Sequence, residues 1–240
     1  MSAFHTVSGE NMSVFVFADH ASNHMPDWVG DLGVSNADMQ RHIAWDIGTE
    51  WVTRALCAQL SCAGVICGFS RLVIDANREL VAPGLIPEFS DATNIPANHG
   101  LSQVLRQERI DRLYQPYHDA IGAGLDARPE ALAISIHSFT PQLRGHPKRK
   151  TDIGLLVKDD TETADQFIAR MATIRPDYRV EINQPYSAYD LNHTVDHNVV
   201  PRGLRHLAIE LRQDHISDQD NAHRMADILA RAIEPLLQEN

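Results

Sequence analysis

The sequence predicts a single-domain α/β fold over residues 1–240, with a mostly parallel mixed sheet flanked by helices. Segments with the short apolar pattern of buried strands alternate along the chain with segments of helical period. Such alternation is typical of sheets whose parallel strands are joined by helical crossovers. No internal repeat or low-complexity segment interrupts the pattern, and 240 residues are enough to bury one sizeable core.

The composition excludes several classes of function. The formal net charge of −11 disfavours nucleic acids and anionic membranes as partners. No apolar run reaches the length of a membrane span, and the first residues lack the pattern of a secretion signal. Cys57, Cys62 and Cys67 are odd in number and lie in apolar surroundings. They predict reduced, buried thiols in a cytoplasmic protein.

The first half of the chain begins with a strand that delivers polar residues at its end. The expected elements are strands over 13–18, 64–68 and the core of 69–79, and helices over 35–60 and 102–121. Ser35 and Asp38 resemble a capping box, and the apolar residues after them keep an approximate helical period. Pro116 is expected to kink the second helix. Between these segments, residues 80–100 are rich in proline, glycine and asparagine and predict a long functional loop.

The second half contains the most apolar strand pattern of the chain. The expected elements are strands over 131–140, 153–157, 178–182 and 207–212, and helices over 161–171 and 217–236. Ser217 and Asp220 are expected to cap the last helix. Residues 142–150 form a basic loop, which is either solvated or the mouth of a site for an anionic substrate. Residues 188–203 form a second polar loop with His193 and His197.

Residues suited to metal chemistry follow three of the expected strands. His20, His137 and Glu210 lie at strand ends, and Asp46 lies among apolar residues of the first expected helix. Ligands usually bind at the carboxyl ends of strands in open α/β sheets. Two imidazoles with a carboxylate and one open position are typical of catalytic zinc, which activates a bound water. Burial would raise the pKa of Glu210 and suit it to accept the proton of that water.

The same residues also fit plainer interpretations. His137 can be a satisfied core histidine, and Asp46 can face water on an amphipathic helix. Arg71, Asn77 and Arg78 can form a fork for a substrate carboxylate, because guanidinium binds carboxylates through two hydrogen bonds. The alternative is a surface ion pair with Asp75 or Glu79.

Several short motifs together carry a family resemblance. They are Asp19-His20-Ala21-Ser22-Asn23, residues 42–48 (HIAWDIG), 70–78 (SRLVIDANR), 116–118 (PYH), 136–139 (IHSF) and 209–212 (IELR). At these residues the chain resembles the N-formylglutamate amidohydrolase family over nearly its whole length. The resemblance implies a phosphorylase/hydrolase-like α/β fold, related to zinc carboxypeptidases and aminoacylases.

The resemblance also implies roles for individual residues. It places His20 and His137 on the metal, Zn²⁺ or another divalent ion, and Glu210 on the general base. Where carboxypeptidase relatives have a glutamate ligand this chain has Asn23, so we expect Asp46 to complete the metal site. The remaining expectations concern the substrate: Arg71 polarises the scissile carbonyl, Asn77 and Arg78 grip a carboxylate, His118 and Ser138 contact the substrate, and Arg144 or Arg212 engages a second carboxylate.

The sequence therefore predicts a metal-dependent amidohydrolase acting on an N-acyl amino acid such as N-formylglutamate, a small anionic substrate. Two alternatives remain at this point. One is a different zinc amidase or peptidase of the same superfamily. The other is a non-catalytic binding protein that kept the pocket.

Overall fold

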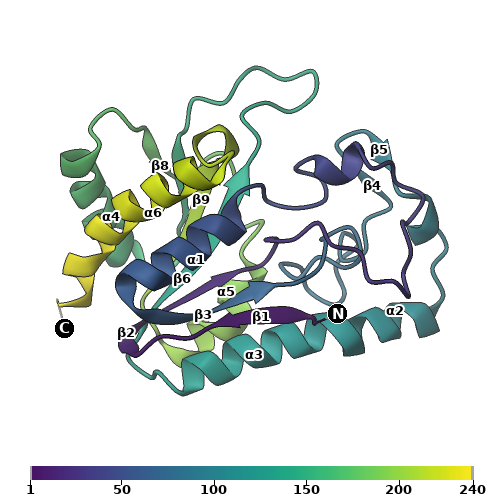
Figure 1. Ribbon diagram of the computed structural model, residues 1–240, viewed down its shortest axis with the longest axis horizontal. Coiled ribbons are helices and arrows are strands. Elements are labelled where there is room, and N and C mark those ends of the chain that lie inside the picture. Colours follow the sequence, from purple (N-terminus) through teal and green to yellow (C-terminus); the bar gives the residue numbers. More distant parts are fainter. Residues whose placement is uncertain (1, 239–240) are drawn as a thin grey trace.

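A seven-stranded mixed sheet forms the centre of the protein (Figure 1). The computed structural model describes residues 2–238. In spatial order the strands are β1 (Phe4–Val7), β3 (Cys62–Cys67), β2 (Asn11–Ala18), β6 (Leu132–Phe139), β9 (His206–Arg212), β7 (Ile153–Leu156) and β8 (Val180–Ile182). Strands β3, β2, β6 and β9 are parallel to their neighbours in that order, and β7 is parallel to β8. Only β1 with β3 and β7 with β9 pair antiparallel within the described sheet, so the predicted sheet is confirmed.

Helices cover both faces of this sheet. They are α1 (Thr49–Leu60), α2 (Gln103–Arg109), α3 (Gln115–Asp126), α4 (Thr161–Ile174), α5 (His193–Asn198) and α6 (Gln219–Ile233). Shorter elements are the hairpin β4 (Phe89–Ser90) and β5 (Thr93–Asn94), the 3₁₀ turns Asp38–Gln40, Pro96–Asn98, Val200–Arg202, Gln213–His215 and Glu234–Leu237, and a π-helical turn at Ile110–Tyr114. Helices α1, α4 and α6 lie on one face, and α3 runs along the other (Figure 1).

Strand β2 shows why both faces need cover. Val14 and Val16 belong to the apolar core under α1 and α6, whereas Phe15 and Phe17 belong to the core under α3. Successive side chains of a strand point to opposite faces, so a run of apolar residues fills two cores at once. No helix within residues 2–238 is both long and apolar enough to cross a membrane. The three cysteines are buried free thiols, as predicted.

The helix expected from Ser35 begins only at Thr49, so that prediction is wrong for its first half. Ser35 does exchange hydrogen bonds with Asp38, but they close a single 3₁₀ turn. Gly48, with φ of +88°, turns the chain before α1. A Cβ atom there would lie 2.2 Å from the carbonyl oxygen of Ile216, so only glycine fits. Asp46 consequently lies in a turn and not on a helix.

The strand expected within 69–79 is also wrong, because this segment forms turns. Its backbone bonds to other loops: the Ser70 amide donates to the His24 carbonyl, and the Asp75 amide donates to the Leu85 carbonyl. The segment therefore lies outside the sheet.

Four smaller features differ from the expectations. The predicted second helix contains the π-helical turn directly before α3, and Pro116 lies in the first turn of α3. The loop 188–203 contains α5, and β1 was not foreseen. Asp218, not Ser217, caps α6 by accepting the Asn221 amide.

Candidate active site

The predicted residues meet at the carboxyl edge of the central strands. His20 is the second residue after β2, and His137 on β6 lies opposite Glu210 on β9 in the strand register. They border a cavity of about 430 Å³. Of the predicted residues, the cavity lining contains His20, Asp46, Arg71, Asn77, Arg78, His137, Ser138 and Glu210.

Two imidazoles converge on one carboxylate oxygen. Oδ2 of Asp46 lies 2.9 Å from Nδ1 of His137 and 3.4 Å from Nδ1 of His20. One ligand atom from each residue can be chosen such that all three lie within 4.8 Å of one another, close enough to hold a metal ion. Asp46 is only 4% exposed, so it does not face water. It is instead one of three buried donor residues that could hold a metal ion.

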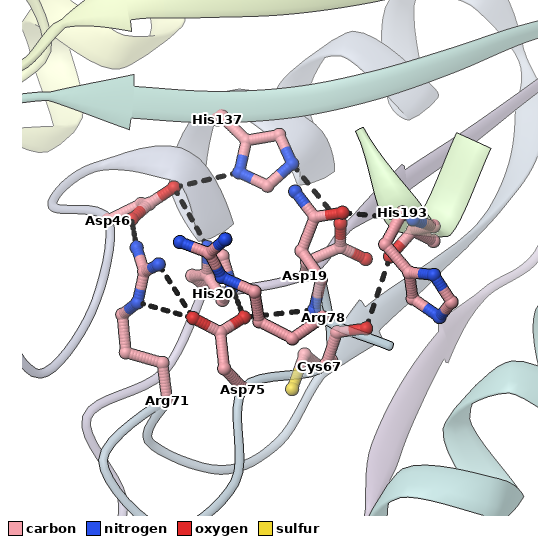
Figure 2. Close-up of polar contacts among 12 residues, drawn as sticks. Asp19, His20, Asp46, Cys67, Arg71, Asp75, Arg78, His137 and His193 are labelled. Carbon is pink, nitrogen blue, oxygen red and sulfur yellow. Dashed lines mark hydrogen bonds and ion pairs between the residues drawn. The ribbon is translucent and has the colours of Figure 1, made fainter. Parts of the chain in front are cut away.

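Two further carboxylates fix the orientation of the imidazoles. Nε2 of His20 lies 2.7 Å from Asp75, and Nε2 of His137 lies 3.1 Å from Asp19. Figure 2 shows the His137 ring between Asp46 on one side and Asp19 on the other. A histidine that donates its Nε2–H to a carboxylate leaves its Nδ1 lone pair free for a metal.

The donor set fits a divalent cation. With both Nε2 atoms donating, two Nδ1 lone pairs face a carboxylate oxygen, and Nδ1 of His20 is buried without a hydrogen-bond partner. Burial acts to lower the pKa of His137, but its hydrogen bonds with Asp19 and Asp46 hold that pKa well above the ordinary value. The electrostatic field of this cluster thus favours positive charge at its centre.

The backbone around Asp46 explains its position. The Asp46 amide donates to the His20 carbonyl, at 2.8 Å, and the Ser138 amide donates to the Asp46 carboxylate, at 3.2 Å. Asn23, which the sequence offered as the alternative position to Asp46, donates its side-chain amide to the Met39 carbonyl. The carboxylate in the cluster therefore comes from Asp46.

Arg71 extends the cluster. Its guanidinium lies 2.7 Å from Oδ2 of Asp75 and 3.3 Å from Oδ1 of Asp46. This is not the surface ion pair considered above, because both carboxylates are buried. The neighbouring charges hold the pKa values of both carboxyl groups below the usual range despite burial.

Glu210 is the carboxylate of the cavity without a fixed role in this network. It is 6% exposed, and its Oε2 has no hydrogen-bond partner. Burial raises its pKa to about 7. A Cβ atom on Gly154, the neighbour of Glu210 across the β7–β9 pair, would lie 3.3 Å from the Glu210 Cβ and 2.0 Å from the Gln184 carbonyl oxygen. Glycine at that position thus preserves the room around Glu210.

Asn77 and Arg78 have different surroundings. The Asn77 side-chain oxygen accepts the Thr194 amide at the start of α5, and the Asn77 amide donates to Asp75. The Arg78 guanidinium lines the cavity and has no hydrogen-bond or ion-pair partner within residues 2–238. It is available to bind an anion.

The structure does not bring three of the expected substrate contacts to the cavity. His118 is buried elsewhere, with its ring nitrogens beside the Ala76 carbonyl and the Asn198 amide. Arg212 forms ion pairs with Asp152 and Asp214. Arg144 is exposed on the basic loop and does not line the cavity, so the loop is solvated at that residue.

Asp19 and Asp75 are the functional residues that the sequence reasoning missed. Asp75 follows the apolar run Leu72-Val73-Ile74. An acidic residue in such surroundings is the same signal that singled out Asp46 and Glu210. Asp19 adjoins His20 at the end of β2 and accepts the Tyr117 hydroxyl at 2.7 Å.

Comparison with known proteins agrees with this site. The model of the N-formylglutamate amidohydrolase family matches residues 12–217, which include every residue of the cluster. The molecule is therefore a hydrolase acting on amide C–N bonds. The chain belongs to the N-formylglutamate amidohydrolase family, as the motifs indicated.

Solved structures show the same fold. A crystal structure of a gene product from Agrobacterium tumefaciens is 31% identical, with a TM-score of 0.93, and the match covers 100% of this chain and 96% of that one. An N-formylglutamate amidohydrolase from Ralstonia eutropha is 18% identical, with a TM-score of 0.79, and covers 100% and 98%. No curated protein shows significant similarity to this chain.

Proposed function

We propose that the protein is a metal-dependent amidohydrolase that cleaves the amide of N-acyl amino acids, the class to which N-formylglutamate belongs. One observation carries the proposal. Two buried imidazoles, each oriented by a carboxylate at Nε2, direct Nδ1 toward the same oxygen of Asp46. The three buried cysteine thiols favour a reducing, cytoplasmic compartment.

His20, Asp46 and His137 would hold the metal, with Zn²⁺ as the first candidate. Three protein ligands with one open position are typical of catalytic zinc sites. A bound divalent ion would supply Lewis acidity, which lowers the pKa of a water toward about 7 and polarises a carbonyl. Asp19 and Asp75 keep the two imidazoles in the tautomer that such a site needs.

Glu210 moves the proton. A carboxylate with a pKa of about 7 can accept a proton from the attacking water and deliver it to the leaving amide nitrogen. Its unpartnered Oε2 in the cavity wall leaves it free for both steps.

The arginines of the cavity bind negative charge. Arg78, whose guanidinium has no partner in the described part of the chain, binds the substrate carboxylate, with Asn77 beside it in the cavity wall. Arg71 stabilises the developing oxyanion through its positive charge, an effect typically worth several kcal/mol in water-excluded sites. Ser138 contributes through its backbone amide, which holds Asp46 in place.

The test combines metal analysis with turnover. We expect the purified protein to contain about one equivalent of metal and to hydrolyse N-formyl amino acids in a chelator-sensitive manner. His137→Ala should lose both metal and hydrolysis. Glu210→Gln should keep the metal but lose turnover by about two or more orders of magnitude, since only the proton acceptor is removed.

Two results would contradict the proposal. A metal-replete, active His137→Ala variant would remove His137 from the metal site, and near-normal turnover of Glu210→Gln would remove Glu210 from the mechanism. Wild-type protein that binds metal but cleaves no N-acyl amino acid would instead support a binding protein. Cleavage of short peptides alone would support a peptidase.

A further inference from the structure

We propose that the site selects substrates with one carboxylate and a neutral, apolar side chain, and that it prefers such N-formyl amino acids over N-formylglutamate. This inference rests on the proposed function and names the substrate class of the same site. N-Formylglutamate carries two carboxylates. A site that prefers it needs a free cationic partner for each of them, whereas a site for substrates with one carboxylate needs only one.

The cavity supplies one free guanidinium. Among the described residues, Arg71 and Arg78 are the arginines that line it, and no lysine does. Arg71 already binds Asp75 and Asp46. The Arg78 guanidinium has no hydrogen-bond or ion-pair partner among residues 2–238 and can take a single carboxylate in the two-point geometry that guanidinium favours.

The guanidinium of Arg149, behind the cavity wall, is also engaged. Arg149 donates to the Thr140 carbonyl at 3.0 Å and to the Tyr186 hydroxyl at 3.2 Å. It stacks over Phe139 and Tyr186, at 5.5 and 4.9 Å from the ring centroids. It does not line the cavity and supports the two aromatic rings that do.

The β4–β5 hairpin contributes an acidic group to the cavity wall. Asp91, at the hairpin turn, lines the cavity, while its partner Arg41 does not. The Asp91 carboxylate lies 2.6 Å from the Arg41 guanidinium. His42 lines the same wall, and burial lowers the pKa of its imidazole, so it offers no cation at neutral pH. A second substrate carboxylate on this side would therefore face the Asp91 carboxylate, whose partner Arg41 lies outside the cavity lining.

The remaining wall is rich in apolar side chains. They are Pro87, Phe89, Phe139, Leu143, Tyr186 and Leu191. Phe89 lines the cavity and is 65% exposed, so an apolar substrate side chain packed against it would remove aromatic surface from water. The charges of the cavity and its apolar side chains thus both favour substrates with one carboxylate and an apolar side chain.

Isosteric substrates give a direct test. We expect kcat/KM of the metal-replete enzyme for N-formyl-L-methionine and N-formyl-L-leucine to exceed that for N-formyl-L-glutamate by about 10-fold or more, because a methylene in a hydrophobic pocket alone changes selectivity by about 10-fold. N-Formyl-L-glutamine, which differs from glutamate in charge and not in shape, should also exceed N-formyl-L-glutamate. The reverse order of glutamine and glutamate would overturn the proposal.

Binding separates this proposal from the proposed function. The Kd values of the same compounds, measured by titration calorimetry with Glu210→Gln protein loaded with metal, should follow the same ranking. Absence of any hydrolysis by the wild type would refute the proposed function. The Kd ranking does not depend on hydrolysis, so it would still support or refute the proposed selectivity.

A variant locates the selectivity. Asp91→Asn removes the charge and keeps a residue suited to the positive φ of 40° at that position. It should raise the ratio of kcat/KM for N-formyl-L-glutamate over N-formyl-L-glutamine about threefold or more. Asp111→Asn, at an exposed aspartate outside the cavity, is the matched control and should leave the ratio unchanged. An unchanged ratio in Asp91→Asn would refute the contribution of the hairpin.

Discussion

Asp19 and Asp75 determine which nitrogen each imidazole directs toward the centre of the site. Each carboxylate holds one Nε2 and is itself held: Asp19 by the Tyr117 hydroxyl, and Asp75 by the Arg71 guanidinium. Carboxylates in this position raise the basicity of metal-binding histidines. In the proposed metal site, the metal affinity would therefore depend on residues that do not touch the metal.

Asp19→Asn should lower the metal affinity about 10- to 100-fold while the protein stays folded. The neutral amide oxygen still accepts a hydrogen bond from Nε2 of His137 but stabilises positive charge on the ring less. Competition with a chromophoric chelator measures the affinity. Tyr117→Phe, which removes only the hydroxyl contact to Asp19, should cost less. Equal affinities in Asp19→Asn and wild type would contradict the role of Asp19.

The predictability of the site differs from residue to residue. His20 and His137 could be predicted because the end of a buried strand fixes the edge at which a side chain lies. Asp75 could be predicted only as a surface partner of Arg71, because a spacing of four residues does not show whether the ion pair between them is buried. Arg144 and Arg212 were placed in the site by charge alone. The partner of a long cationic side chain is decided by tertiary contacts, here Asp152 and Asp214 for Arg212.

At the scale of elements, the strands could be predicted better than the segments around them. An apolar run buried on both faces, such as β6, has few alternatives to a central strand. The segment before α1 keeps a helical period, but it does not join the helix. Gly48 adopts a left-handed backbone conformation between the turn that carries Asp46 and the start of α1. The apolar run Leu72-Val73-Ile74 packs into the core without pairing in the sheet, and hydrophobicity alone does not distinguish these outcomes.

Helix α3 offers a matched pair of glycines that tests its packing on β2. A Cβ atom on Gly124 would lie 2.3 Å from the buried Phe15 ring, whereas one on Gly122 would meet only the end of the Arg202 side chain at 3.3 Å. Gly124→Ala should destabilise the protein by about 1–3 kcal/mol through overpacking. Gly122→Ala should stabilise it by up to about 1 kcal/mol through helix propensity.

Urea denaturation of both variants measures these free energies of unfolding. Because the two positions share a helix and a substitution, propensity alone predicts the same change for both. Equal effects would show that α3 does not approach β2 as closely as described.

At the scale of the whole molecule, the site joins parts of the chain that are far apart in sequence. His20 follows β2 near the start, His137 lies on β6 in the middle, and Glu210 lies on β9 near the end. The order β2-β6-β9 makes these strands neighbours, so their carboxyl ends form one edge. A ligand held between His20 and His137 therefore binds only when the centre of the sheet is formed.

Metal binding should consequently stabilise the entire fold. A ligand present at 1,000 times its Kd and bound only by the folded state stabilises that state by about 4 kcal/mol. In a protein of this size this corresponds to a Tm increase of roughly 10 °C. Scanning calorimetry with and without a chelator measures the difference. In His137→Ala, which lacks one ligand, the chelator should change Tm little. A wild-type Tm that does not change when the chelator is added would show that no metal stabilises the folded state. A cation bound only by the folded protein must raise its stability.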